Sequence, residues 1–273
     1  MRPHTLAAIL VALTLPAQPV PTRAADAEVD VALVLAVDVS LSMTPEEQRI
    51  QREGYVAAFR SGAVQGAVRQ GLIGRIAVTY VEWAGVDSQV VVVPWTVIGT
   101  ADEAEGFADR LARMPRRRAV WTSIAGALDF SAGLLREAGF AASRHVIDVS
   151  GDGPNNQGRA VTRARDDAVA AGIVVNGLPL MIRAPTGPYD VPDLDLYYRD
   201  CVIGGPGAFM VPVREPDAFA EAIRTKIVRE VADAGMPAAE PTPRVLPAQA
   251  PGQAYTPARC AEAGRRAGYG LDP

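Results

Sequence analysis

Lysine and histidine are scarce in this chain of 273 residues, and each shortage argues against a class of enzyme. The single lysine is Lys226, and the two histidines are His4 and His145. Phosphoryl-transfer enzymes use a lysine to stabilise the transferring phosphate, and serine hydrolases need a histidine base beside the serine. Lys226 falls in the last predicted domain helix and His145 at the start of a predicted strand, so neither kind of enzyme is favoured.

The chain also lacks an apolar run of about 20 residues, the length that spans a bilayer. A shorter apolar run, residues 6–15, follows Arg2 and His4 and precedes small-residue cleavage candidates at 25–27. This pattern predicts a secretory signal peptide over residues 1–27, with an N-terminal membrane anchor as the disfavoured alternative. We therefore expect a periplasmic or secreted protein with no membrane span after signal removal.

Basic charge and cysteine are both limited. Cleavage after Ala27 leaves 25 basic and 30 acidic residues, and nucleic-acid binding favours a basic face, so no nucleic-acid partner is expected. The one dense basic cluster, residues 116–118, is interpreted as a solvated loop. Cys201 and Cys260 permit one disulfide in an exported protein, but their spacing leaves open whether the two meet.

The chain does contain alternating apolar strands and amphipathic helices. This alternation predicts a doubly wound, mostly parallel α/β sheet with helices on both faces. A short turn and Pro94 favour one antiparallel strand at an edge. Residues 28–233 then form one domain, and the Pro-rich residues 234–273 form an extended tail. The predicted strands are 29–37, 76–83, 90–95, 145–150, 173–180 and 209–213, and the helices are 45–68, 101–114, 124–138, 159–171 and 217–233.

Oxygen-bearing side chains follow the first predicted strand at alternate positions: Asp38, Ser40 and Ser42. A helix start comes next, with Thr44 as N-cap and Glu47 closing a capping box. Strand, loop and helix in this order mark the sheet edge where open α/β folds bind ligands. Hard oxygen donors without Cys or His favour Mg²⁺, Mn²⁺ or Ca²⁺.

Two later loops belong to the same edge. Thr122 stands just before the helix that begins near residue 124, and Asp152 follows the strand at 145–150. Loops after neighbouring parallel strands converge on one crevice, so we expect five side chains around one ion: Asp38, Ser40, Ser42, Thr122 and Asp152. The alternative is that the serines only cap the following helix and Asp152 only shapes a turn.

These three loops, in this order, resemble the metal-ion-dependent adhesion site of von Willebrand factor A-type domains over about residues 29–232. The resemblance implies that Ser40, Ser42 and Thr122 contact the metal directly or in a neighbouring state of the site. Asp38 and Asp152 would bind it directly or through water, and one position would stay open for a partner's Asp or Glu. Four stretches are also similar to an uncharacterised bacterial family, known only as a domain of unknown function with an A-type fold: 83–85, 148–156, 176–179 and 202–209.

Other residues near these loops have structural alternatives. Asp148, inside an apolar strand, is interpreted as a structural hydrogen-bonding group, since a buried carboxylate without a partner is costly. Asn155 and Asn156 either shape the Asp152 loop or touch a ligand. Tyr197 and Tyr198 either form a recognition rim or pack within an insertion.

The resemblance and the missing catalytic partners favour a non-enzymatic, exported module that binds the Asp or Glu of a partner protein through a divalent cation. A Mg²⁺-dependent phosphoryl-transfer hydrolase also carries an aspartate after its first strand, but it normally has a second aspartate where Ser40 stands. A scaffold protein with a vestigial metal site is the third hypothesis.

Overall fold

The computed structural model describes residues 27–183, 191–232 and 254–267. The predicted signal peptide, residues 1–27, lies outside this part of the chain except for Ala27, and so does much of the predicted tail. Within the described residues, no helix combines the length and the apolar character needed to cross a bilayer.

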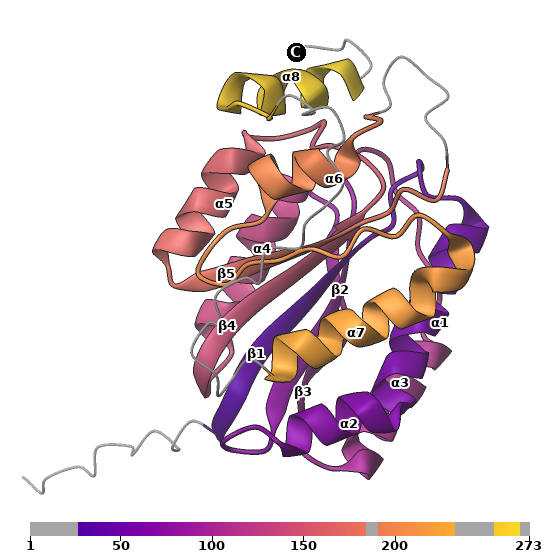
Figure 1. Ribbon diagram of the computed structural model, residues 1–273, viewed down its shortest axis with the longest axis vertical. Helices are drawn as coiled ribbons and strands as arrows, with labels where there is room; N and C mark the ends of the chain where they lie inside the picture. The colour runs from indigo at the N-terminus through magenta and orange to yellow at the C-terminus, as the bar shows by residue number, and fades with distance from the viewer. Residues whose placement is uncertain (1–26, 184–190, 233–253, 268–273) are drawn as a thin grey trace, which may run out of the picture.

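In the described part of the chain, five strands form one sheet in the order β3-β2-β1-β4-β5 (Figure 1). The β1–β2, β1–β4 and β4–β5 pairs are parallel, whereas β2 and β3 pair antiparallel at one edge. The predicted fold class is therefore confirmed. The strands are β1 (Ala27–Asp38), β2 (Ile76–Trp83), β3 (Gln89–Ile98), β4 (Phe140–Gly151) and β5 (Ile173–Pro179).

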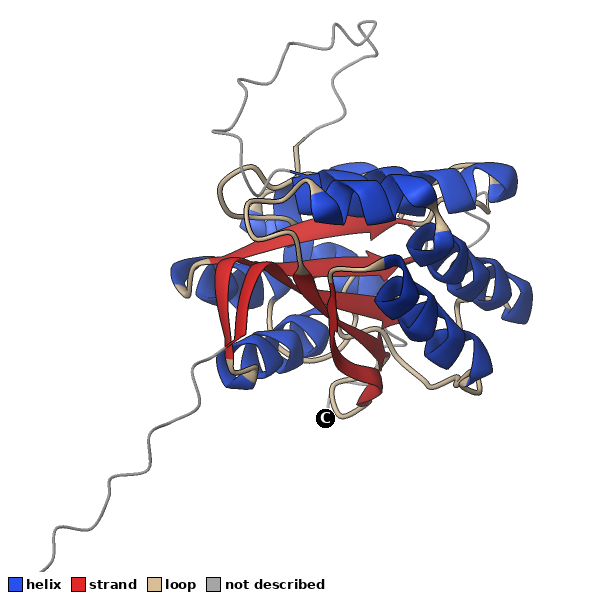
Figure 2. Cartoon of the chain, turned by 90° about the horizontal axis from the view of Figure 1, so that it is seen from below, coloured by secondary structure: helices blue, strands red, loops and turns tan. Residues whose placement is uncertain are grey.

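Helices cover both faces of the sheet, as the side view in Figure 2 shows. One face packs against α1 (Pro45–Arg60), α2 (Gly62–Arg69), α3 (Ala101–Arg113) and α7 (Phe219–Ala232). The other packs against α4 (Ile124–Glu137), α5 (Val161–Ala170), α6 (Leu194–Tyr197) and the π-helix that continues it at Tyr198–Val202.

The central strand β1 contributes to both cores. Leu33 and Leu35 lie in the core under α1 and α7, while Val34 and Ala36 lie in the core under α4 and α5. A parallel strand buried on both faces is a continuous apolar run, and this run is the sequence signal that predicts β1. This burial fixes the direction of β1 and therefore the place where its last residue, Asp38, enters the loop.

The helix predicted over residues 45–68 is two helices. Ser61 has an extended backbone that ends α1, and its hydroxyl caps the start of α2 by accepting from the Val64 N–H. The local cap therefore overrides an amphipathic pattern that continues across the break.

The strand predicted over residues 209–213 is not a regular strand. It forms only isolated bridges to the β5 side of the sheet, at Met210 and Val213. The N–H groups of Val211 and Val213 donate to the carbonyls of Gly177 and Pro179, so Pro212 occupies a position whose N–H is not needed for pairing with β5.

The tail is partly helical, so the prediction of an extended tail is wrong for residues 257–267. α8 (Pro257–Ala267) begins with a proline, which favours the first helical position. A disulfide joins Cys201 of the π-helix to Cys260 of α8, and Cys260 and Ala263 are buried in the core cluster that also holds residues of α4 and α5. The cysteine pair that the spacing left open is thus joined.

Candidate metal centre

β1 ends at Asp38, and hydrogen bonds between polar groups hold the loop that follows in a turn. The Ser40 N–H donates to Asp38 Oδ1 at 2.7 Å, and Ser40 Oγ and Ser42 Oγ share a hydrogen bond of 2.8 Å. α1 then begins with the predicted capping box: Thr44 Oγ1 accepts from the Glu47 N–H, and Glu47 Oε2 accepts from the Thr44 N–H. The box fixes the start of α1 and thereby the end of the loop.

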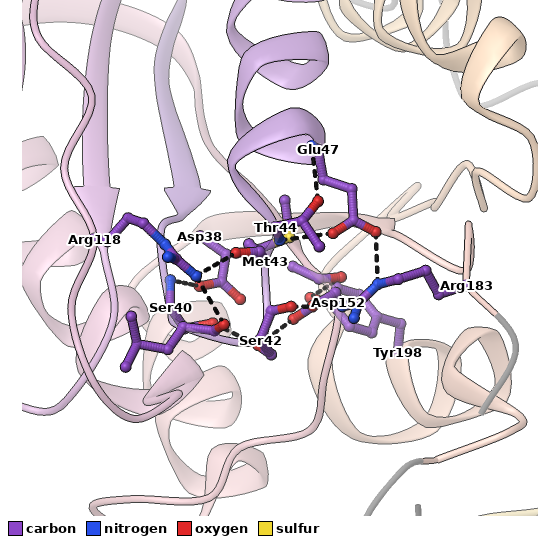
Figure 3. Close-up of polar contacts among 12 residues, drawn as sticks. Asp38, Ser40, Ser42, Met43, Thr44, Glu47, Arg118, Asp152, Arg183 and Tyr198 are labelled. Carbon is purple, nitrogen blue, oxygen red and sulfur yellow. Dashed lines mark hydrogen bonds and ion pairs between the residues drawn. The ribbon is translucent and has the colours of Figure 1, made fainter. Parts of the chain in front are cut away.

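Asp152 reaches the same place from β4. Because β4 pairs in parallel with β1 nearly to the end of both strands, their following loops meet at one edge of the sheet. The Ser42 hydroxyl donates to Asp152 Oδ1 at 2.7 Å. Asp38, Ser40, Ser42 and Asp152 therefore form one hydrogen-bonded chain (Figure 3), which brings four of the five predicted ligand residues together.

Main-chain contacts hold the Thr122 loop against the other two loops. The Ala119 N–H donates to the Val39 carbonyl at 3.1 Å. The Thr122 N–H donates to Asn156 Oδ1, and the Asn156 N–H donates to the Thr122 carbonyl, both at 2.8 Å. Thr122 is 5% exposed, so the fifth predicted residue lies at the same edge and is fixed there through its backbone.

Trp121, directly before Thr122, has a φ of 70°. A bulky residue rarely adopts this left-handed region, which costs on the order of 1–3 kcal/mol and persists only where surrounding contacts enforce it. The bonds of the neighbouring Ala119 and Thr122 supply that enforcement. Backbone strain of this kind concentrates at ligand-binding sites, and here it is stored beside a candidate ligand residue.

Asp38 is a buried carboxylate with one unsatisfied oxygen. Its Oδ2 has no hydrogen-bond partner among the described residues. Gly151 passes so close that a Cβ at this position would lie 2.8 Å from Asp38 Oδ2. Burial, followed by the charge of Asp152, raises the pKa of Asp38 well above its ordinary value. A buried charge without a partner is costly, and a cation at this position would remove much of that cost.

Arg118 braces the first loop from one side (Figure 3). It donates to the carbonyls of Leu41 and Met43 at 3.1 and 3.0 Å. The sequence predicts a solvated loop for Arg118. Its side chain is exposed, but it also holds the loop that carries the candidate ligands. The only sequence signal was its position shortly before Thr122.

Arg183 approaches from the opposite side, as Figure 3 shows, and it was not predicted from the sequence. Its Nε donates to Glu47 Oε1 at 2.8 Å, and its Nη2 donates to Asp152 Oδ2 at 3.0 Å. Burial raises the pKa of Asp152, whereas the hydrogen bond from Ser42 and the charge of Arg183 lower it. Arg183 closely follows the carboxyl end of β5, which was the one available signal that it reaches this edge.

Two alternatives were open for Tyr197 and Tyr198, a recognition rim and a packed insertion. Both side chains are 0% exposed, which favours the packed insertion. The Tyr197 hydroxyl accepts from the Asn155 N–H at 3.1 Å, and the Tyr198 hydroxyl donates to the Gly151 carbonyl at 3.4 Å. Asn155 also caps α4, and Asn156 ties the Asp152 loop to Thr122, so both asparagines shape the loops.

The mixed five-stranded sheet, with the Asp38, Thr122 and Asp152 loops at the carboxyl ends of its parallel strands, defines a von Willebrand factor A-like domain. The chain belongs to the family described as "Protein of unknown function (DUF1194)", whose model matches residues 28–235. No curated protein sequence matches the chain.

Several solved structures share this fold. The pilus adhesin SpaC from Lactobacillus rhamnosus GG, in its open conformation, aligns with a TM-score of 0.54 and 13% identity over 78% of this chain and 30% of that chain. Proximal thread matrix protein 1 of the mussel byssus aligns with a TM-score of 0.53 and 13% identity over 77% of this chain and 49% of that chain. A von Willebrand factor type A protein from Catenulispora acidiphila aligns with a TM-score of 0.50 and 12% identity over 76% of this chain and 43% of that chain. This chain thus spans less than half of each of these proteins, and the similarity establishes the fold.

Proposed function

We propose that the protein is a metal-dependent binding module that engages a carboxylate of a partner protein. The observation that carries this proposal is Asp38 Oδ2, a buried carboxyl oxygen that lies where three loops converge and has no hydrogen-bond partner among the described residues. When bound, a divalent cation supplies a coordination position for an Asp or Glu of the partner. The residues that would hold the cation are Asp38, Ser40, Ser42, Thr122 and Asp152.

The donor set suits a hard cation such as Mg²⁺, Mn²⁺ or Ca²⁺. These ions take carboxylate, hydroxyl, carbonyl and water oxygens, and Mg²⁺ commonly binds through one or two carboxylates. The described residues contain no group of three or more His, Cys, Asp or Glu side chains placed to hold a metal. The serine and threonine hydroxyls are therefore needed to complete the set, which leaves the cation only partly neutralised and attractive to an outside carboxylate.

The surface beside the site indicates the chemistry of the partner. Leu41 and Val120 are 51% and 56% exposed. They follow Ser40 and Ala119, which form a parallel bridge between the two loops, so the two aliphatic side chains flank the candidate metal position. This arrangement favours an acidic side chain with aliphatic neighbours on the partner.

The position of Lys226 supports binding over phosphoryl transfer. Its ammonium lies 2.7 Å from Asp148 Oδ1 in the protein core, and both side chains are 1% exposed. The only lysine of the chain is therefore committed to an internal ion pair. The Cys201–Cys260 disulfide supports the predicted periplasmic or secreted location, because disulfides persist mainly in oxidising compartments.

Metal binding is tested by calorimetric titration of Mg²⁺ and Mn²⁺ into EDTA-treated protein, with thermal denaturation as a second readout. We expect millimolar or tighter binding that Asp38→Ala abolishes and that Asp87→Ala, a change to an exposed aspartate of the β2–β3 turn, leaves intact. No binding in the wild type would favour a vestigial site and a scaffold role.

Partner binding is tested by capture from periplasmic or secreted fractions of the native host in Mg²⁺, compared with EDTA and with Asp38→Ala. Leu41→Ser/Val120→Ser should bind metal normally but lose the partner. A parallel assay of phosphate-ester hydrolysis separates the enzyme hypothesis, since robust Mg²⁺-dependent turnover that Asp38→Ala abolishes would overturn the binding proposal.

A further inference from the structure

The positively charged guanidinium of Arg183 contacts the residues of the candidate metal centre. Its guanidinium donates to Asp152 Oδ2 at 3.0 Å and to the Ser42 carbonyl at 2.5 Å, and its Nε donates to Glu47 Oε1 at 2.8 Å. One side chain thus contacts a carboxylate of the proposed ligand set and the main chain of a second ligand residue. We propose that Arg183 is a built-in competitor of the metal ion, an inference that rests on the proposed metal-binding function.

The competition follows from charge. The Asp152 side chain is only 6% exposed, and a buried carboxylate is costly unless a positive charge lies beside it. Arg183 supplies that charge when no metal is bound. A divalent cation on the same carboxylate would be repelled by the guanidinium, because like charges a few ångströms apart in a partly buried site are weakly screened. Metal binding is therefore opposed until the arginine leaves Asp152.

The difference in exposure shows which partner can leave. The Arg183 side chain is 53% exposed, whereas those of Asp152 and Glu47 are 6% and 10% exposed. The guanidinium can move into solvent without opening the core, while the carboxylates remain in place. The exchange of Arg183 for a metal ion therefore needs only a side-chain rotation.

Arg118 provides a matched control because it flanks the same loop with the same charge. It donates to the Leu41 and Met43 carbonyls, and no hydrogen bond or ion pair with Asp152 is among its contacts in the described residues. If charge near the site were the only factor, loss of Arg118 and loss of Arg183 would have equal effects. The contact between Arg183 and Asp152 predicts a larger effect for Arg183.

The experiment measures Mg²⁺ and Mn²⁺ affinity by calorimetry at low and physiological salt for the full mature chain and for Arg183→Gln, Arg183→Lys and Arg118→Gln. We expect Arg183→Gln to bind metal at least fivefold more tightly, within the range usual for coupled sites. Arg183→Lys, which retains the charge, should stay near wild type. In EDTA, Arg183→Gln should melt about 2–4 °C lower, as expected for a loss on the order of 1 kcal/mol in a domain of this size.

Unchanged or weaker metal affinity in Arg183→Gln, while the wild type binds metal, would overturn the competitor role and leave the proposed function intact. An equal gain in Arg118→Gln would also overturn it, since the specific contact would then be irrelevant. Absence of binding in every variant would overturn both proposals. Binding by Arg183→Gln but not by the wild type would be the strongest support for competition.

Discussion

Asp148 on β4 and Lys226 on α7 form an ion pair of 2.7 Å in which both side chains are 1% exposed. Lys226 also pairs with Glu230, so one ammonium serves two buried carboxylates. Asn176 on β5 donates to Glu230 Oε1 at 3.2 Å. The cluster ties α7 to β4, the strand that leads into the Asp152 loop, and it gives Asp148 the structural role expected from its apolar surroundings.

Replacement of Lys226 by Met should lower the free energy of unfolding by about 3–5 kcal/mol, because two buried carboxylates would lose their shared cation. Urea denaturation measures this loss. The matched control is Arg224→Met on the exposed side of the same helix, where a surface pair with Glu221 is worth about 1 kcal/mol or less. Equal losses in the two variants would contradict a stabilising role for the buried cluster.

The same cluster predicts that stability falls as pH rises. Burial, followed by the charge of Asp148, raises the pKa of Glu230 to about 7, whereas a glutamate in the unfolded chain titrates near pH 4.3. Between about pH 4.3 and 7 the folded state holds the extra proton, so the contribution of Glu230 to stability is largest below this window and declines through it. The slope is at most about 1.4 kcal/mol per pH unit.

Urea denaturation between pH 5 and 8 of the wild type and Glu230→Gln isolates this contribution from the other carboxylates. The difference in unfolding free energy between the two proteins should change steadily across the window and level off above about pH 7. Parallel profiles for the two proteins would show that Glu230 does not titrate there.

The sheet and the metal loops could be predicted because their signals are local. The β1 run is apolar throughout since both faces are buried, and the Thr44–Glu47 capping box marks the helix start within four residues. The Asp38, Ser40 and Ser42 spacing then falls between two recognised elements. Parallel-sheet topology supplies the convergence of the Thr122 and Asp152 loops, because strands side by side end at one edge.

The missed features depend on contacts between distant parts of the chain. Arg183 meets Asp152 through a side chain whose direction no periodicity encodes. Tyr197 and Tyr198 are adjacent, which favours neither face, and only the packed insertion buries both. α8 is a short helix whose position is secured by a disulfide to Cys201, and a cysteine pair alone does not specify which segments it joins.

Loss of the disulfide should release α8 while the sheet stays folded. In Cys260→Ser the segment before the helix would keep the hydrogen bonds from Tyr255 to Asp193 and Asp200, but α8 itself would lose its covalent tether. Because even about 1.4 kcal/mol of lost local stability raises the open population tenfold, tryptic cleavage at Arg259 should accelerate at least tenfold. Mass spectrometry of timed digests measures the rate.

Cleavage at Arg144, the tryptic site within β4, serves as the internal control for that digest and should stay slow, since this strand pairs with β1 inside the sheet. Equal acceleration at Arg259 and throughout the core would mean that the disulfide supports the whole domain. No acceleration at Arg259 would show that packing alone retains α8.

We expect the carboxylate of Asp38 to lower the stability of the metal-free protein and to be required for metal binding. Asn at this position keeps the oxygen that accepts from the Ser40 N–H and removes the unpaired negative charge. In EDTA, Asp38→Asn should therefore be more stable than the wild type by on the order of 1 kcal/mol, because an unpaired buried amide costs less than an unpaired buried carboxylate. With Mg²⁺ at about 100 times its dissociation constant, the wild type should gain about 2.7 kcal/mol, and Asp38→Asn should gain none.

Thermal and urea denaturation with EDTA and with Mg²⁺ give the four stabilities needed, and Asp87→Asn on the exposed β2–β3 turn is the matched control. That control should respond to Mg²⁺ as the wild type does. A less stable Asp38→Asn in EDTA would mean that the carboxylate is already satisfied in the metal-free protein. A normal Mg²⁺ response in Asp38→Asn would place the metal elsewhere. The sign of the EDTA difference therefore tests the unpaired oxygen directly, without knowledge of the partner.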